Sequence, residues 1–211
     1  MSILRLLSIV YADNLVVATL YPDTSEQYVP SLDVYTDPEL WSCGLCEFHG
    51  YGSKNVLCNY DTISYGVANL YDIDLSTAWI PDGILNAELT INFDYPSNSV
   101  YADPWQFHGV ISIFNGYCKS KKLWSSNSRV KEMKVYYNDS YVCNVRLLDT
   151  WKCQRVDIQR FFKNRRDKKF LDARYEIKSG DVLRFVVTDV YYGDKYSDIA
   201  ISEFLFENGG N

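Results

Sequence analysis

The fold is indicated first by residues 131–147, which read KEMKVYYNDSYVCNVRL. Apolar side chains alternate with polar ones in both halves of this stretch, as in strands with one buried face. Those that share the apolar side are Met133, Val135 and Tyr137 before the turn and Tyr141, Cys143, Val145 and Leu147 after it. The turn-forming residues 138–140 (NDS) separate the two halves. The stretch therefore predicts an antiparallel β-hairpin, with Cys143 as a small buried hydrophobic residue.

Other windows predict more strands of the same kind. Residues 88–94 alternate most clearly, with Leu89, Ile91 and Phe93 on one side. Further strands are expected over residues 110–114, 155–161, 182–190 and 199–206, separated by segments with turn-forming residues. Aromatic residues make up 16% of the chain, which favours strands over helices. Strands in succession without a helical period predict an all-β protein of two packed antiparallel sheets.

The length of 211 residues suffices for one sandwich core with an added segment. Residues 1–54 alternate less regularly, and glycines interrupt the pattern at residues 50–53 (GYGS). We therefore expect an N-terminal extension over residues 1–54, irregular or strand-containing, and one β-domain over residues 55–211.

The charge argues against a nucleic-acid partner. The formal net charge is −6, whereas nucleic-acid binders need a cationic surface to displace counterions from phosphates. Residues 1–104 hold 14 acidic and 2 basic residues, and residues 105–211 hold 13 acidic and 19 basic ones. The two halves could attract each other or partners of opposite charge.

The N-terminus does not predict a membrane span. Asp13 and Asn14 interrupt the apolar residues of positions 1–20, so no run approaches the roughly 18 apolar residues that a spanning helix needs. A signal peptide ending at Ala12 would satisfy the small-residue cleavage rule. Its apolar stretch, residues 6–10, is shorter than the usual range of roughly 7 to 15.

Four ordered motifs carry a resemblance to a known superfamily. They are residues 69–79 (NLYDIDLSTAW), 115–117 (NGY), 127–131 (NSRVK) and 193–204 (GDKYSDIAISEF). Together they resemble the discoidin, or galactose-binding-like (F5/8 type C-like), superfamily, in its glycan-binding branch found beside secreted bacterial NAD glycohydrolases. The resemblance covers about residues 55–211. It departs at Ile73, where the family usually has Gly between the two acids.

The resemblance implies an antiparallel jelly-roll β-sandwich that binds a ligand through loops at one end, usually without catalysis. It also implies a bacterial protein that is secreted, periplasmic or on the cell surface. Many relatives hold a structural calcium ion, which takes oxygen ligands from separated segments. The matching positions are Asp72, Asp74, Thr77 and Glu203. The alternative is that these residues cap turns and accept backbone N–H bonds.

Glycan recognition requires aromatic faces for sugar C–H groups and a few fixed polar groups. The candidates expected in loops are Trp105, Asn115, Tyr117, Trp124, Arg129 and Tyr192. Trp124 and Tyr117 rank first, because the polar stretch around Trp124 offers no periodic strand to bury its ring. The alternative for each residue singly is packing in the core or at its rim.

Two further clusters have competing interpretations. Residues Cys43, Cys46, His49 and Cys58 have ligand types found in zinc sites, but their spacing matches no common finger, and disulfides or thiols compete. The basic run over residues 163–169 could contact an anionic glycan, lipid headgroups or the acidic half of the chain. Such a run is more often a solvated loop.

The leading hypothesis is a non-catalytic glycan-binding module, and the alternative is an extracellular protein-interaction or adhesion module. A small glycan hydrolase using Asp72, Asp74 or Glu203 as acid and base is a third. Enzyme motifs are weak, because the chain has two histidines and no Gly-x-Ser-x-Gly sequence.

Overall fold

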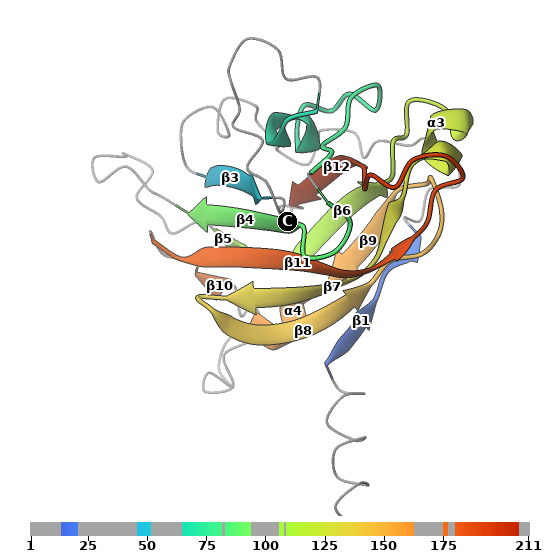
Figure 1. Ribbon diagram of the computed structural model, residues 1–211. Coiled ribbons are helices and arrows are strands. Elements are labelled where there is room, and N and C mark those ends of the chain that lie inside the picture. The colour runs from blue at the N-terminus through green and yellow to red at the C-terminus, as the bar shows by residue number, and fades with distance from the viewer. Residues whose placement is uncertain are drawn as a thin grey trace, which may run out of the picture.

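The computed structural model describes residues 14–20, 46–51, 65–81, 83–93, 106–107, 109–162, 175–176 and 180–206. Two sheets pack face to face (Figure 1). The larger has six strands in the order β1-β8-β7-β11-β4-β3, and the smaller has four in the order β12-β6-β9-β2. Strands β10 and β5 form a separate pair. Neighbouring strands are antiparallel except β1 and β8, which run parallel. The predicted all-β sandwich is confirmed.

The strands are β1 (Leu15–Val17), β2 (Thr19–Leu20), β3 (Cys46–Tyr51), β4 (Glu88–Phe93), β5 (Gln106–Phe107), β6 (Val110–Asn115), β7 (Arg129–Tyr137), β8 (Ser140–Arg146), β9 (Gln154–Asp157), β10 (Tyr175–Glu176), β11 (Val182–Tyr191) and β12 (Ile201–Phe206). The helices are the 3-10 turn η1 (Val67–Leu70), α3 (Lys121–Ser126) and α4 (Gln159–Phe162).

The predicted hairpin is present as β7 and β8. Asn138 and Asp139 have φ angles of 46° and 62°, which is the left-handed pair that a tight type I′ turn requires. The register shifts by one residue after the pair Val135 and Cys143, so one residue of β8 bulges. The prediction that Tyr141 faces the core was wrong, because this bulge turns its side chain to solvent and Val142 packs against the core instead.

The other predicted strands are β4, β6, β9, β11 and β12. The prediction of a strand through residue 161 was wrong beyond Asp157. The carboxylate of Asp157 accepts a hydrogen bond from the backbone N–H of Gln159, which starts the short helix α4. Ile158 and Phe162 are buried at the i, i+4 spacing of a helix.

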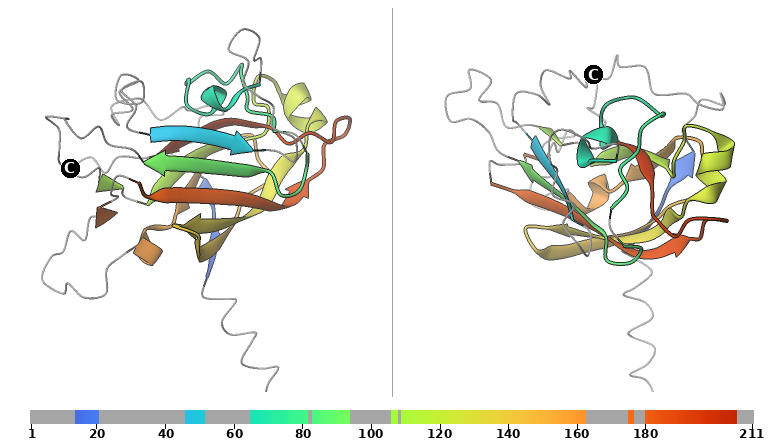
Figure 2. Two further views of the ribbon diagram at one scale, coloured as in Figure 1. Left: turned by 60° about the vertical axis from the view of Figure 1, so that its left-hand side comes forward. Right: turned by 45° about the horizontal axis from the view of Figure 1, so that its top comes forward.

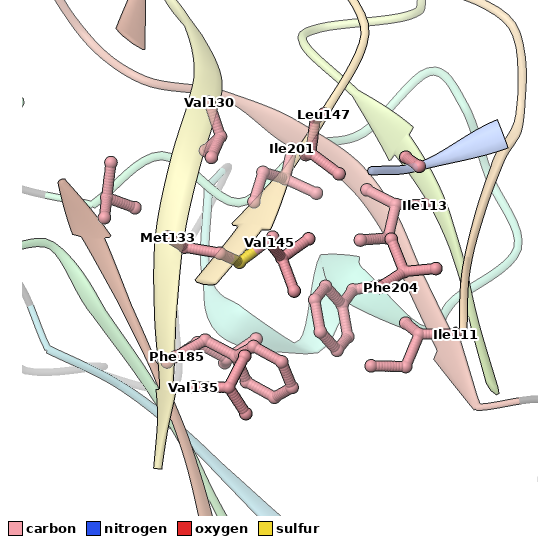
Figure 3. Packing of buried hydrophobic residues seen from close by; sticks show 14 of the residues in the cluster. Ile111, Ile113, Val130, Met133, Val135, Val145, Leu147, Phe185, Ile201 and Phe204 are labelled. Atoms are coloured by element: carbon pink, nitrogen blue, oxygen red, sulfur yellow. The ribbon is translucent and has the colours of Figure 1, made fainter. Parts of the chain in front are cut away.

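The main core lies between the two sheets (Figure 3). Phe185 of the larger sheet meets Phe204 of the smaller one edge to face, with ring centroids 4.9 Å apart. Around this pair Val135, Val145 and Ile111 are fully buried. Cys143 is buried in the same core, as predicted.

A second apolar cluster lies on the outer face of the smaller sheet. Every residue of β6 and β12 is buried, so these strands are covered on both faces. The outer cover packs around Phe114, Cys118 and Cys153, against which Leu75, Trp124 and Trp151 lie half-buried. We call these six residues the outer cluster. Residues 71–79 and 115–124 supply half of it, namely Leu75, Cys118 and Trp124, and both segments run along this side of the sheet (Figure 2).

Three strands come from the predicted N-terminal extension. β1 pairs with β8, β2 with β9, and β3 with β4, so residues before position 54 contribute to both sheets. The domain boundary at residue 54 itself stays a prediction. Among the described residues, no helix is long and apolar enough to cross a membrane.

Candidate functional site

Several described loops gather at one end of the sandwich. Tyr191, the last residue of β11, pairs with Arg129, the first of β7, and the backbone at Ile201 bridges to Trp79 and Gly116. These pairings bring residues 71–79, 115–129, 147–153 and 191–200 to the same end. We call it the loop end. All four motifs of the sequence lie in it or extend into it.

The acidic loop of residues 72–77 is organised by its own side chains. One carboxylate oxygen of Asp72 accepts from the backbone N–H of Asp74 at 2.9 Å, and the other accepts from the hydroxyl of Thr77 at 2.7 Å. Asp74 accepts from the backbone N–H of Ser76 at 2.8 Å. The hydrogen bonds from Ser76 lower the pKa of Asp74. Turn capping therefore accounts for the Asp and Thr positions of this loop.

Ile73 keeps the backbone geometry that the resemblance assigned to glycine. Its φ angle is 61°, in the left-handed region that a β-branched residue rarely adopts. The hydrogen bond from Asp74 to Asp72 spans this residue and helps to hold the conformation. Ile73 thus takes a backbone conformation that glycine adopts without strain.

Glu203 lies beneath this loop and is not explained by turn capping. Its side chain points from β12 to the outer face, opposite Phe114, and the residue is 0% exposed. Neither carboxylate oxygen has a well-formed hydrogen bond among the described residues. Burial, followed by the negative charge of nearby Asp72, raises the pKa of Glu203 to about 9. The carboxyl group is therefore mostly protonated at neutral pH in the metal-free protein.

The donor set fits a hard cation better than a soft one. The side chains offer oxygen ligands only, from Asp72, Asp74, Thr77 and Glu203. The buried carboxyl group of Glu203 has no well-formed hydrogen bond among the described residues, and a cation would supply a partner. The described residues nonetheless contain no three His, Cys, Asp or Glu side chains already arranged to hold a metal ion. A cation would have to draw Glu203 and the acidic loop closer together.

Tyr117 borders the acidic loop. Its hydroxyl donates to the backbone carbonyl of Ser76 at 3.1 Å, and its ring meets Tyr65 edge to face with centroids 6.1 Å apart. Tyr65 is 46% exposed. The charge of the exposed Lys119 acts on Asp74. An aromatic pair, an acid and a base therefore lie together on this surface.

Trp124 lies in the helix α3 and not in a loop. The hydroxyl of Ser120 caps the helix by accepting from the N–H of Leu123 at 3.2 Å. The Trp124 indole N–H donates to the carbonyl of Asn115 at 2.8 Å. A β-carbon at Gly116 would lie 2.5 Å from the ring. No strand buries this ring; instead a six-residue helix packs it, half-buried, into the outer cluster.

Arg129 joins the segments of the loop end. Its guanidinium lies over the Trp124 ring at 4.3 Å and donates to Asp149 at 2.8 Å. It also donates to the carbonyls of Asn127 at 2.8 Å and Trp124 at 3.1 Å. Arg129 is 6% exposed, so its guanidinium is buried within the loop end and bonded to these partners.

The remaining sequence candidates divide between buried and exposed positions. Asn115 is fully buried, and its amide exchanges two hydrogen bonds with the backbone of Val130, so we leave it out of the ligand site proposed below. Tyr192 is 69% exposed at the loop end. Trp105, the side chains of the zinc candidates Cys43, Cys46, His49 and Cys58, and the basic run 163–169 lie outside the described residues.

Tyr65 and Ser202 contribute to the loop end but are not among the sequence candidates. The hydroxyl of Ser202 donates to the carbonyl of Thr77 and accepts from the N–H of Cys118, which ties both loops to β12. Its signal in the sequence is a polar pair, Ser202 and Glu203, inside an otherwise apolar strand. Tyr65 has no such signal, because it follows no periodic pattern.

Residues 49–207 match the family described as the NAD glycohydrolase translocation F5/8 type C domain. The chain belongs to this family. In this F5/8 type C domain the four motifs thus mark the loop end.

Solved structures give weaker likenesses. The CBM32-1 and CBM32-2 domains of Clostridium perfringens ZmpB in complex with GalNAc are 11% identical with a TM-score of 0.47, and the match covers 92% of this chain and 40% of that one. SpGH29 is 12% identical with a TM-score of 0.43, and the match covers 78% of this chain and 27% of that one. CpGH89CBM32-6 produced by Clostridium perfringens is 15% identical with a TM-score of 0.35, and the match covers 79% of this chain and 95% of that one. The chain thus spans less than half the length of the first two. No curated protein matches it. Likeness at this level says nothing about the ligand of this chain.

Proposed function

We propose that this F5/8 type C domain is a non-catalytic module that binds carbohydrate at the loop end. The observation that carries the proposal is the half-exposed pair of Tyr65 and Tyr117 beside Asp74 and Lys119. Sugars present C–H faces that pack on aromatic rings and hydroxyl groups that bond to charged side chains. This surface offers both kinds of contact within one patch.

The proposal gives the sequence candidates different roles. Tyr117, with Tyr65, contacts the sugar, and Tyr192 supplies a further exposed ring at the same end. Trp124 and Arg129 hold the loops that present these rings, because their polar groups bond to the protein itself. Asp72, Asp74 and Glu203 have turn or ion roles in this proposal, which does not use them as the acid and base of a hydrolase.

A calcium ion is the second part of the proposal. Asp72, Asp74, Thr77 and Glu203 would hold it, and the buried, unpartnered Glu203 is the observation that supports it. When bound, the ion supplies positive charge that fixes the acidic loop. Since Tyr117 bonds to the carbonyl of Ser76 in this loop, an ordered loop would also position the aromatic pair.

The calcium proposal is tested by calorimetry on chelated protein. Wild type should give a saturable heat with calcium, and the Glu203→Gln variant should give none. Glu132→Gln is the matched control, because Glu132 is a surface carboxylate paired with Arg146, and it should bind as wild type does. Absence of a calcium heat in wild type, or an unchanged heat in Glu203→Gln, would refute the site.

Carbohydrate binding is tested on an array of mono- and oligosaccharides, with calcium and again with chelator. We expect saturable binding to at least one sugar class, weaker in chelator if the ion orders the loop.

A protein partner is the second candidate function. The family description concerns the translocation of a polypeptide, an NAD glycohydrolase, which favours this candidate. It also fits a secreted context. This function would be established instead by two results. No sugar on the array would bind in either buffer, and a polypeptide would bind saturably without being displaced by free sugar.

A further inference from the structure

Cys118 and Cys153 lie in the same buried cluster although 35 positions separate them in the chain (153 − 118). Both are thiols in the structure. Cys118 follows β6, and Cys153 precedes β9. These strands pair up to Ile113 and Gln154, so the next antiparallel pair is Phe114 and Cys153. Phe114 and Cys153 thereby share the outer face of the sheet.

The chain returns over this face at Cys118. The backbone N–H of Cys118 donates to Ser202 at 2.9 Å, which fixes the position of the turn. The sulfur of Cys118 lies 3.8 Å from the carbonyl oxygen of Trp151, two residues before Cys153. Burial raises the pKa of Cys118 to about 12, and the charge of Cys153 acts in the same direction. The two thiols thus share one apolar cluster, and they are close enough for the charge of one to act on the other.

We propose that Cys118 and Cys153 form an intramolecular disulfide when the chain folds in the presence of a small-molecule disulfide. The reaction is two thiol–disulfide exchanges. One cysteine thiolate attacks oxidised glutathione and releases glutathione thiolate. The second cysteine thiolate attacks the mixed disulfide and releases another. The two cysteines lose two protons and two electrons, and oxidised glutathione becomes two reduced molecules.

The bond would join two segments of the loop end. Residues 115–120 carry Tyr117, and residues 149–153 carry Asp149, which accepts from Arg129. The proposal does not depend on what the loop end binds. Because both sulfurs are buried, reagents in solution reach them only when the segments open, so the bond forms during folding and resists reduction afterwards.

Peptide mapping of the full chain tests the proposal. Wild-type protein is refolded with oxidised glutathione or with reductant, its remaining thiols are alkylated, and it is digested with chymotrypsin. Cleavage after Tyr117 and Trp151 places Cys118 and Cys153 in peptides without other cysteines. We expect these two peptides to be joined only in the oxidised sample. Alkylation of both cysteines there, or their pairing with other cysteines, would overturn the proposal.

Thermal unfolding gives a second readout. The oxidised wild type should have a Tm higher than the reduced one by on the order of 5–10 °C, because the bond restricts the unfolded chain. Cys143→Ala is the matched control, since Cys143 is equally buried but faces the main core, and it should keep the redox dependence. Cys118→Ala/Cys153→Ala should lose it. If that variant does not fold, the peptide map of the wild type still shows whether Cys118 and Cys153 are joined.

Discussion

Glu203 places a carboxyl group under the acidic loop without a well-formed hydrogen bond. Burying an ionised group without a partner costs several kcal/mol, and such a group commonly keeps its proton instead. The raised pKa of Glu203, about 9, expresses that cost. In the metal-free protein this residue therefore links stability to pH.

The first prediction concerns this linkage in the presence of chelator. Between about pH 4.5 and pH 9 the folded protein keeps a proton on Glu203 that the unfolded chain has released. The free energy of unfolding should therefore fall as pH rises, by at most about 1.4 kcal/mol per pH unit from this group. Denaturant unfolding of wild type and Glu203→Gln across this range measures the effect. Stability differences that do not grow with pH would contradict it.

The second prediction concerns Ile73. Its positive φ angle of 61° strains a β-branched residue by on the order of 1–3 kcal/mol, whereas glycine adopts it freely. Ile73→Gly should raise the free energy of unfolding by about 1 kcal/mol. Ile73→Ala retains a β-carbon and should not stabilise to the same degree. Equal effects of the two substitutions would mean that backbone strain is not the cause.

At the scale of elements, α3 depends on a close backbone approach. Gly116 has a φ angle of 106°, and an added β-carbon would lie 2.5 Å from Cδ1 and 2.8 Å from Nε1 of Trp124. Two further contacts hold the ring: its N–H donates to the carbonyl of Asn115, and the guanidinium of Arg129 lies over its face. The helix and the turn after β6 therefore fit together only when residue 116 lacks a side chain.

The third prediction follows from that fit. Gly116→Ala should destabilise the protein by about 2 kcal/mol or more and change the fluorescence of Trp124, because strain adds to the clash. Gly180→Ala is the matched control, since its φ angle is 87° but nothing lies within 4 Å of the added carbon. It should cost only the backbone strain, about 1 kcal/mol. Similar losses in both variants would exclude the Trp124 clash.

Periodicity in the sequence predicted strands well where apolar and polar residues alternate over several positions. This alternation predicted the positions of β4, β7 and β11, because every second side chain of these strands enters the main core. It could not locate α3 or α4, which are too short to show a helical period. It also missed the bulge at Val142, since one extra residue leaves the local composition unchanged.

The candidate site was predictable only in part for the same reason. The motifs include the acidic loop and Tyr117, and the structure places these two in contact. They could not show that Trp124 and Arg129 stack on each other or that Asn115 bonds to Val130. Those roles depend on contacts between segments far apart in the chain.

At the scale of the whole molecule, the two sheets are joined by the ring pair of Phe185 and Phe204. The smaller sheet is covered on both faces, by the main core and by the outer cluster. The strands of the smaller sheet that carry the loop end therefore cannot move without disturbing two apolar layers.

The fourth prediction tests the main core. Phe185→Ala should lower the free energy of unfolding by about 3–5 kcal/mol, because a large buried side chain leaves a cavity. Tyr136→Ala, on the solvent face of the neighbouring strand β7, should cost much less. Unfolding in denaturant compares the two. A small loss at Phe185 would mean that the sheets are not joined there.

Titration calorimetry with a sugar selected on the array tests whether Tyr65 and Tyr117 bind carbohydrate. Tyr65→Ala/Tyr117→Ala should lose the binding heat. Tyr136→Ala/Tyr141→Ala is the matched control, because those rings form an equivalent edge-to-face pair with centroids 6.0 Å apart, and Tyr141 is 44% exposed on the outer face of the larger sheet. We expect wild-type affinity in the control and none in the first variant. Equal affinity in both variants would contradict it.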